Sequence, residues 1–222
     1  MSGLLYKRIF KPLYQCLPFS WQYRLRSLRY GLFTNMIVQR WKQKGKPIPP
    51  PPQVKHHIIR KIQEHYHYPI LVETGTYKGD TIQALKKSFR QIYTIEIGEE
   101  LFRDAQRRFR KEAHIHVLHG DSGHLLNKVM KEIDAPAIFW LDGHYSGKLT
   151  ARGTIESPIL DEIDAVCSKM EQRHVILIDD ARSFSGKDYP SLSRLEDHFF
   201  QHCPDYQMQV KDDIIYFTPH NT

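Results

Sequence analysis

Short apolar runs alternate with amphipathic stretches from about residue 53 to the end of the chain. Five runs are typical of buried strands: Ile70–Glu73, Ile92–Glu96, Ile115–His119, Ala137–Asp142 and the HVILIDD segment at 174–180. Helical spacing of apolar residues predicts helices over Val54–His65, Thr81–Phe89, Leu101–Glu112, Leu125–Ile133 and Ser157–Val166. This alternation predicts a parallel sheet with helices on both faces.

The C-terminal part adds a different pattern. After a predicted helix near Leu192–His202, two alternating segments, Tyr206–Val210 and Ile214–Thr218, flank a turn at Lys211–Asp213. This pattern predicts a β-hairpin and therefore an antiparallel member of the sheet. Ligands of such α/β sheets bind at the carboxyl ends of the strands. The residues that follow each strand are therefore the candidate site.

The segment before residue 53 has another character. Ser20 is placed to cap a helix whose apolar positions are Tyr23, Leu28, Leu32, Met36 and Ile37. The PIPPPP stretch, Pro47–Pro52, ends any helix and predicts a stiff, extended linker. The chain is thus divided into an extension (residues 1–46), a proline linker (47–52) and a domain (53–222). At 222 residues it is long enough for one domain with a sizeable core.

Charge is divided at nearly the same place. Thirteen Lys and Arg precede the first acid, Glu64. The rest of the chain contains the other nineteen Lys and Arg and all twenty-five Asp and Glu. The formal net charge of +7 therefore describes a basic extension joined to a mildly acidic domain. Three scattered cysteines, Cys16, Cys167 and Cys203, favour a reducing compartment. Without a long apolar run or a signal-peptide pattern, the sequence predicts a cytoplasmic protein.

Acidic residues close three successive predicted strands. Glu73 precedes Gly75 and Gly79 in ETGTYKG, where the glycines allow the backbone to approach a ligand at a helix N-terminus. A carboxylate there would repel a pyrophosphate but attract an amino or sulfonium group. Glu96 follows at a spacing suited to ribose hydroxyls, and Asp121 in GDS could accept a hydrogen bond from an adenine amino group. Each acid alone is more simply a cap or a solvated charge, but the three together form one ordered pattern.

From about Val54 to Phe217, this order of residues resembles the class I S-adenosylmethionine-dependent methyltransferases. The resemblance implies a Rossmann-like, doubly wound, seven-stranded sheet with one antiparallel strand. It also implies S-adenosylmethionine across the first three strand ends, with Glu73 at its amino end, Glu96 at its ribose and Asp121 at its adenine. The remaining cofactor positions that it implies are Gly75, Thr76, Gly79, Ser122 and Asp142. FWLDGHYSG and LIDDARSF are also similar to segments of uncharacterised bacterial methyltransferase-like proteins.

Three further carboxylates are expected where the methyl acceptor should lie. Asp142 closes the fourth predicted strand, and Asp179 and Asp180 close the fifth. Such a cluster is costly unless it is protonated, solvated or bound to a cation, and oxygen ligands favour Mg²⁺. The arrangement resembles metal-dependent O-methyltransferases that act on catechols and macrolide sugars, although the catechol branch has a lysine after the fourth strand that this chain lacks. Alternatively, Asp179 caps a helix or bonds Arg182, and Asp142 touches only the cofactor.

His144 lies two residues after Asp142 and is the candidate general base, because an ordinary histidine pKa is near 6.5. The segment from Gly143 to Glu156 has three glycines and no apolar periodicity, which predicts a mobile lid over the acceptor. Lys148 and Arg152 within it could hold a substrate carboxylate or phosphate, or could be ordinary exposed charges.

The sequence therefore predicts an O-methyltransferase that uses S-adenosylmethionine and Mg²⁺ to methylate a hydroxyl of a small molecule or glycan. A nucleic-acid methyltransferase is a weaker alternative, because LDGH (141–144) lacks the Asn/Asp-Pro-Pro-aromatic block of base-methylating enzymes. A non-catalytic module that binds the cofactor or a membrane is another alternative. The basic, aromatic residues 1–46 are expected either to bind anionic membranes or to pack on the domain.

Overall fold

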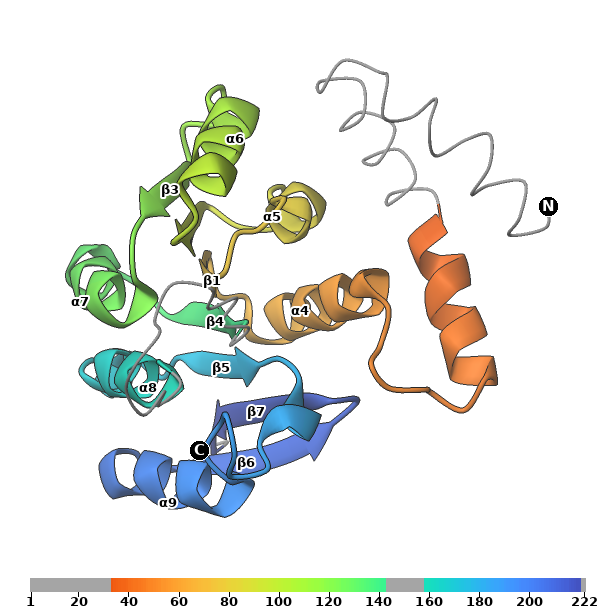
Figure 1. Cartoon of the computed structure of the whole chain (residues 1–222), viewed down its shortest axis with the longest axis vertical. Coiled ribbons are helices and arrows are strands. Elements are labelled where there is room, and N and C mark those ends of the chain that lie inside the picture. The colour runs from red at the N-terminus through yellow and green to blue at the C-terminus, as the bar shows by residue number, and fades with distance from the viewer. Residues whose placement is uncertain (1–32, 143–157, 221–222) are drawn as a thin grey trace.

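A computed structural model describes residues 33–142 and 158–220, and in it seven strands form one sheet (Figure 1). The strand order is β3-β2-β1-β4-β5-β7-β6. Strands β1 to β5 are mutually parallel, whereas β7 runs antiparallel to both of its neighbours. The strands are β1 (Ile70–Thr74), β2 (Gln91–Glu96), β3 (Ile115–His119), β4 (Ala137–Leu141), β5 (Val175–Ile178), β6 (Tyr206–Lys211) and β7 (Ile214–Pro219). The predicted fold class is confirmed.

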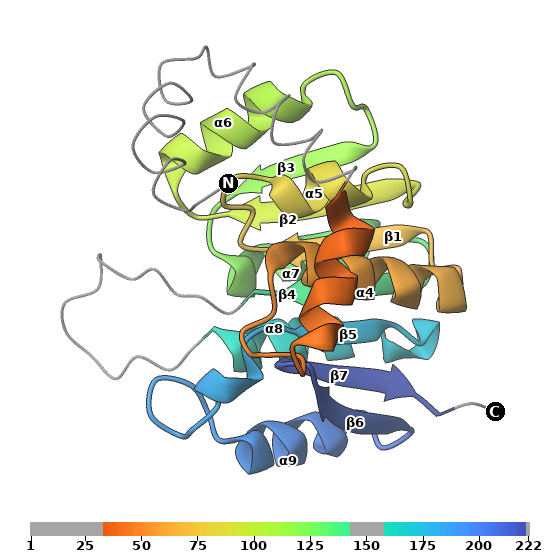
Figure 2. The same cartoon turned by 90° about the vertical axis from the view of Figure 1, so that its right-hand side faces the viewer.

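Helices cover both faces of the sheet (Figures 1 and 2). One face packs against α4 (Pro52–Tyr66), α5 (Asp80–Leu85) and α6 (Glu99–Phe109), through residues such as Ile59, Ile82 and Phe109. The other face packs against α7 (Ser122–Glu132), α8 (Ile159–Cys167) and α9 (Leu192–His202), through residues such as Leu126 and Phe199. Two short 3₁₀ helices, Met170–Gln172 and Ala181–Ser183, flank β5. Short strands without polar alternation are the expected result of burial on both faces.

Two predicted helix boundaries differ from the structure. Helix α5 ends at Leu85 rather than near Phe89, because the chain turns there, with Ser88 N donating to Leu85 O, to begin β2 at Gln91. Phe89 remains buried, so the apolar position was meaningful although the helix had ended. Helix α8 begins at Ile159, directly after Pro158, and Ser157, where the predicted helix begins, lies outside the described residues.

The described end of the extension contacts the domain. Residues 33–43 are helical, and Val38 and Trp41 on this helix are buried against Val54 and Ile58 of α4. Trp41 Nε1 also donates a hydrogen bond to Pro47 O at 2.9 Å. The division of the chain at residues 47–52 stays a prediction, although the last of these prolines is already the first residue of α4. Among the described helices, none is long and apolar enough to cross a membrane.

Candidate functional site

Backbone hydrogen bonds align the ends of strands β1 to β5 in one row. The residue after a strand makes one more backbone hydrogen bond to the neighbouring strand. These bonds run from Gly75 N to Ile95 O at 2.9 Å, from Asp142 N to Thr74 O at 3.3 Å and from Asp179 N to Leu141 O at 3.0 Å. These bonds fix the residues that follow the strands relative to one another, and the predicted acids therefore lie along one edge of the sheet.

Glu73 is buried at the end of β1. Its Oε2 accepts a hydrogen bond at 2.7 Å from Thr94 Oγ1 on β2, and that hydroxyl also lies 2.6 Å from Thr76 Oγ1. Burial raises the pKa of Glu73 to about 8, and the negative charges of Asp142 and Glu96 act in the same direction. A cationic ligand group would relieve this cost by favouring the ionised carboxylate.

The loop after β1 depends on two glycines with positive φ. Gly75 has a φ of 85°, and a Cβ there would contact the backbone of Asp142 at 3.4 Å. Gly79 has a φ of 67°, and its Cβ would lie only 2.7 Å from the ring of Phe109. Glu96 holds the same loop, because its carboxylate accepts hydrogen bonds from Tyr77 N at 2.7 Å and Gly98 N at 2.8 Å. The loop is thus pressed against both neighbouring strand ends.

At the third strand end, Asp121 is the N-cap of α7 and accepts a hydrogen bond from His124 N at 3.2 Å. The next residue, Ser122, donates a hydrogen bond at 2.5 Å to Oε1 of Glu162 on α8. Burial raises the pKa of Glu162 to about 7. Side-chain hydrogen bonds with Ser122 and with Thr74 on β1 oppose this rise, so Glu162 joins α8 to the ends of β1 and β3.

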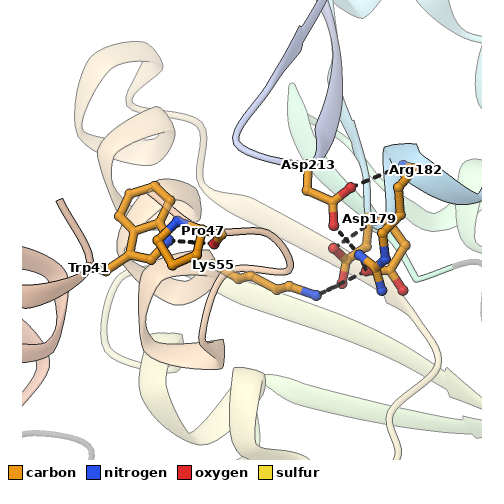
Figure 3. Close-up of polar contacts among 7 residues, drawn as sticks. Trp41, Pro47, Lys55, Asp179, Arg182 and Asp213 are labelled. Atoms are coloured by element: carbon orange, nitrogen blue, oxygen red, sulfur yellow. Dashed lines mark hydrogen bonds and ion pairs between the residues drawn. The ribbon is translucent and has the colours of Figure 1, made fainter. Parts of the chain in front are cut away.

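The aspartates after β5 are paired with cations from the chain itself (Figure 3). Asp179 Oδ2 lies 2.5 Å from the Nζ of Lys55 on α4, and its Oδ1 accepts a hydrogen bond from Asp180 N at 2.8 Å. Asp180 Oδ1 lies 3.4 Å from the same Nζ and 2.8 Å from Arg182 Nη1. Both carboxylates are buried.

The turn between β6 and β7 completes the corner of the site formed by Lys55, Asp179, Asp180 and Arg182. Asp213 is buried there, accepts a hydrogen bond from Arg182 N at 3.0 Å and forms an ion pair with the Arg182 guanidinium. Its carbonyl oxygen accepts a hydrogen bond from Ala181 N at 2.9 Å. The C-terminal hairpin therefore fixes the segment that directly follows Asp179 and Asp180.

These contacts bear on whether Mg²⁺ fits. Mg²⁺ requires several oxygen ligands close together, and the predicted ligands Asp142, Asp179 and Asp180 are not drawn together in this way. Among the described residues, the one such group with ligand atoms all within 4.8 Å is Asp164, His198 and His202. Asp179 and Asp180 already hold Lys55 and Arg182, so the set as placed does not offer an open magnesium site.

Electrostatics at this corner are strongly coupled. Burial raises the pKa of Asp179 to about 6, against the opposing effect of the Lys55 charge. For Lys55, burial alone would lower the pKa, but Asp179, Asp180 and Asp142 together raise it above its ordinary value. Lys55 is therefore a cation at neutral pH, and the Asp179 carboxylate lies directly beside it.

The structure gathers most of the predicted site residues at one edge of the sheet, and their individual roles stay predictions. His144, Lys148 and Arg152 lie outside the described residues. Arg182 bonds Asp180, not Asp179 as the alternative interpretation supposed. Sequence reasoning missed Lys55, Glu162 and Asp213. Glu162 lies in the first turn of α8, where any acid is favoured by the helix dipole, and no local pattern singles out the other two.

Comparison with known proteins gives matches to solved structures. No protein-family model and no curated protein matches the chain. The SAH-bound methyltransferase PaMTH1 of Podospora anserina is 11% identical, with a TM-score of 0.54 over 100% of this chain and 97% of that one.

Two further structures are also similar. The O-methyltransferase TomG of Streptomyces achromogenes, in complex with SAM, is 12% identical with a TM-score of 0.52, over 85% of this chain and 90% of that one. An O-methyltransferase of Bacillus cereus in complex with SAH is 12% identical with a TM-score of 0.51, over 83% and 90%. At such identities the likeness concerns the fold, and the chain has the fold of class I S-adenosylmethionine-dependent methyltransferases.

Proposed function

We propose that this protein is an S-adenosylmethionine-dependent O-methyltransferase that acts on a hydroxyl of a small molecule or glycan. The observation that carries the proposal is the row of acids at the ends of β1, β2 and β3, headed by a buried Glu73 whose pKa is about 8. The structures of similar fold that hold SAM or SAH support the choice of cofactor.

The residues along this edge suit the parts of the cofactor. Glu73 would face the cationic amino end, near the close approach of Gly75 to Asp142. Each carboxylate oxygen of Glu96 accepts one backbone hydrogen bond and has a further lone pair for a ribose hydroxyl. The exposed Asp121 remains for the adenine end. When bound, S-adenosylmethionine supplies an electrophilic methyl group.

The ends of β4 and β5 would hold the acceptor. Asp179, with a pKa of about 6, can accept a hydrogen bond or a proton from an approaching hydroxyl, and the Lys55 ammonium beside it favours the negative oxygen that results. His144 stays the base predicted from sequence. Magnesium assistance likewise stays a prediction, and no step here depends on it.

Cofactor choice is tested by isothermal titration of the full-length protein with S-adenosylhomocysteine and, separately, with NAD. We expect micromolar binding of the first and none of the second. Glu96→Ala should weaken binding by about 1–3 kcal/mol, the range for a hydrogen bond to a charged group. Glu64→Ala, at an exposed acid of α4 that pairs with Lys61, is the matched control. Binding of NAD in place of S-adenosylhomocysteine would end the proposal.

A second readout tests the role of Glu73. The Glu73 carboxyl is largely protonated near neutral pH in the protein without cofactor. Binding of a cationic amino group beside it should therefore release a proton. Titrations in two buffers of different ionisation enthalpy measure this release. We expect it in the wild type and its loss in Glu73→Gln. Equal proton release in both proteins would place the amino group elsewhere.

A further inference from the structure

Lys55 lies where a metal ion was expected. Its Nζ is 2.5 Å from Asp179 Oδ2 and 3.4 Å from Asp180 Oδ1, and its side chain is 17% exposed. Figure 3 shows the side chain extended from α4 toward Asp179. The negative charge at the end of β5 is thus neutralised from within the chain.

Local preference does not explain this placement. Lys55 lies in the first turn of α4, where the helix dipole disfavours a cation, and this turn carries no acid to offset it. The favourable partners are instead 124 and 125 residues away in the sequence. The start of α4 is in turn fixed by the Trp41–Pro47 hydrogen bond and by the apolar contact between Trp41 and Val54.

Arg182 occupies the opposite side of Asp180 and is itself paired with Asp213. A Mg²⁺ ion binds its oxygens at about 2.0–2.1 Å. At Asp179 or Asp180 it would lie within a few ångströms of the ammonium or the guanidinium, where like charges repel strongly in a partly buried site. The cationic side chains and a divalent ion therefore compete for the same oxygens.

We infer that Lys55 is the resident cation of this site and takes the place that the sequence assigns to Mg²⁺. The protein would then need no divalent ion at the end of β5. That the same ammonium also stabilises the acceptor oxygen rests on the proposed function; its exclusion of Mg²⁺ does not.

The test is titration of the full-length protein with Mg²⁺ alone. The variants are Lys55→Met and, as a matched control on the same helix, Lys61→Met, whose lysine pairs with Glu64 on the exposed surface. We expect weak binding by the wild type and the control. Lys55→Met should bind one ion at least about tenfold more tightly, and adding Asp179→Asn should abolish the gain.

Two results would overturn the inference: wild-type binding of one Mg²⁺ that Asp179→Asn removes, or no gain in Lys55→Met. If Lys55→Met does not fold, the wild-type melting temperature decides, because a rise in Mg²⁺ that Asp179→Asn abolishes contradicts a resident lysine and no rise supports it. S-adenosylhomocysteine binding is measured on the same samples, so failure of the proposed function would be seen separately.

A second, independent observation lies between α8 and α9. His198 and His202 are one turn apart on α9, and Asp164 on α8 faces both, with its Oδ1 2.7 Å from His198 Nε2 and 3.8 Å from His202 Nε2. Two ligands on a tetrahedral zinc ion, with bonds of about 2.0–2.1 Å, lie roughly 3.3 Å apart. The two distances from Asp164 lie on either side of this value.

Imidazole and carboxylate together suit zinc rather than magnesium. The geometry points to a zinc-type site of three protein ligands that joins α8 to α9 and leaves one position for water. Cys167 and Cys203, whose Sγ atoms are 3.1 Å apart, lie at the ends of these helices. Their thiols are the alternative ligands for an added zinc ion.

Titration with Zn²⁺ alone tests this site. We expect one ion per chain and a higher melting temperature, with both effects lost in His198→Ala and in His202→Ala. His124→Ala is the control, because His124 pairs with Asp121 at 3.1 Å in a comparable exposed contact. Retained binding in the two α9 variants, or its loss in Cys167→Ser, would overturn the assignment.

Discussion

Single residues in this site carry charges that burial makes expensive. Burial raises the pKa of Glu73 to about 8, that of Glu162 to about 7 and that of Asp179 to about 6. These carboxylates cannot all be ionised in the empty protein without a cost that folding must offset. Within the described ranges, only the last of the three has a cationic side chain beside it, Lys55, so the other two are the groups that a bound ligand can influence most.

Glu73 therefore gives a pH-dependent stability. Its carboxyl binds a proton more tightly in the folded protein than in the unfolded chain, so the free energy of unfolding falls as pH rises from about 4.5 to about 8. At 1.36 kcal/mol per pKa unit the loss is at most about 4–5 kcal/mol. Urea unfolding across this range should show a shallower decline in Glu73→Gln than in the wild type. Parallel curves would contradict the raised pKa.

At the scale of elements, two contacts hold the site in place. The loop between β1 and α5 fits against α6 because Gly79 has no Cβ, and the helix of residues 33–43 fits against α4 through Trp41. The first contact positions the loop that is proposed to bind the cofactor, and the second positions the start of the helix that carries Lys55. For each contact, a control variant lies in the same backbone conformation or on the same helix but does not touch the partner residue.

Gly79→Ala should combine backbone strain with a collision. Gly45 has a similar φ of 77°, but a Cβ added there would meet nothing within 4 Å, so Gly45→Ala measures strain alone, on the order of 1–2 kcal/mol. Gly79→Ala adds contact with Phe109, for a further cost of about 1–3 kcal/mol, and should also weaken S-adenosylhomocysteine binding. Equal unfolding free energies for the two variants would show that the loop or the Phe109 ring moves aside without destabilising the fold.

Trp41→Ala should destabilise the fold by about 3–5 kcal/mol, the range for a buried aromatic residue. Trp41 is 4% exposed, whereas Met36 on the same helix is 58% exposed, so Met36→Ala is the control and should change little. Denaturant unfolding of the full-length protein compares them. A small effect of Trp41→Ala would mean that this helix is not an integral part of the domain.

At the scale of the whole molecule, the extension has two expected roles that can be separated. Removing residues 1–46 deletes the buried Trp41 contact and should lower the melting temperature. Removing residues 1–32 keeps that contact and should leave the melting temperature close to that of the full chain. If membrane binding resides in residues 1–32, the shorter deletion should lose sedimentation with anionic vesicles at low salt. A full-length protein that ignores such vesicles would refute membrane binding.

Much of the fold was predictable because each strand and helix is encoded locally. The runs at 115–119 and 192–202 match β3 and α9 residue for residue, and the acids at strand ends follow from the strands themselves. The partners of Asp179 and Asp180 were not predictable in this way. Lys55 is 124 residues from Asp179 on a helix whose dipole disfavours it, and Asp213 lies in the two-residue turn between β6 and β7. Contacts of this kind become visible only when the topology is known.

The hairpin contact through Asp213 has a consequence for synthesis. The corner that holds Asp179 and Asp180 uses residues from α4, from the end of β5 and from the turn between β6 and β7, which is made after the other strands. A ribosome-bound chain can complete β1 to β4 early, but the corner must wait until the last strands have left the exit tunnel. Fragments that end before residue 213 would therefore expose two buried aspartates, and quality control would encounter them as unfinished proteins.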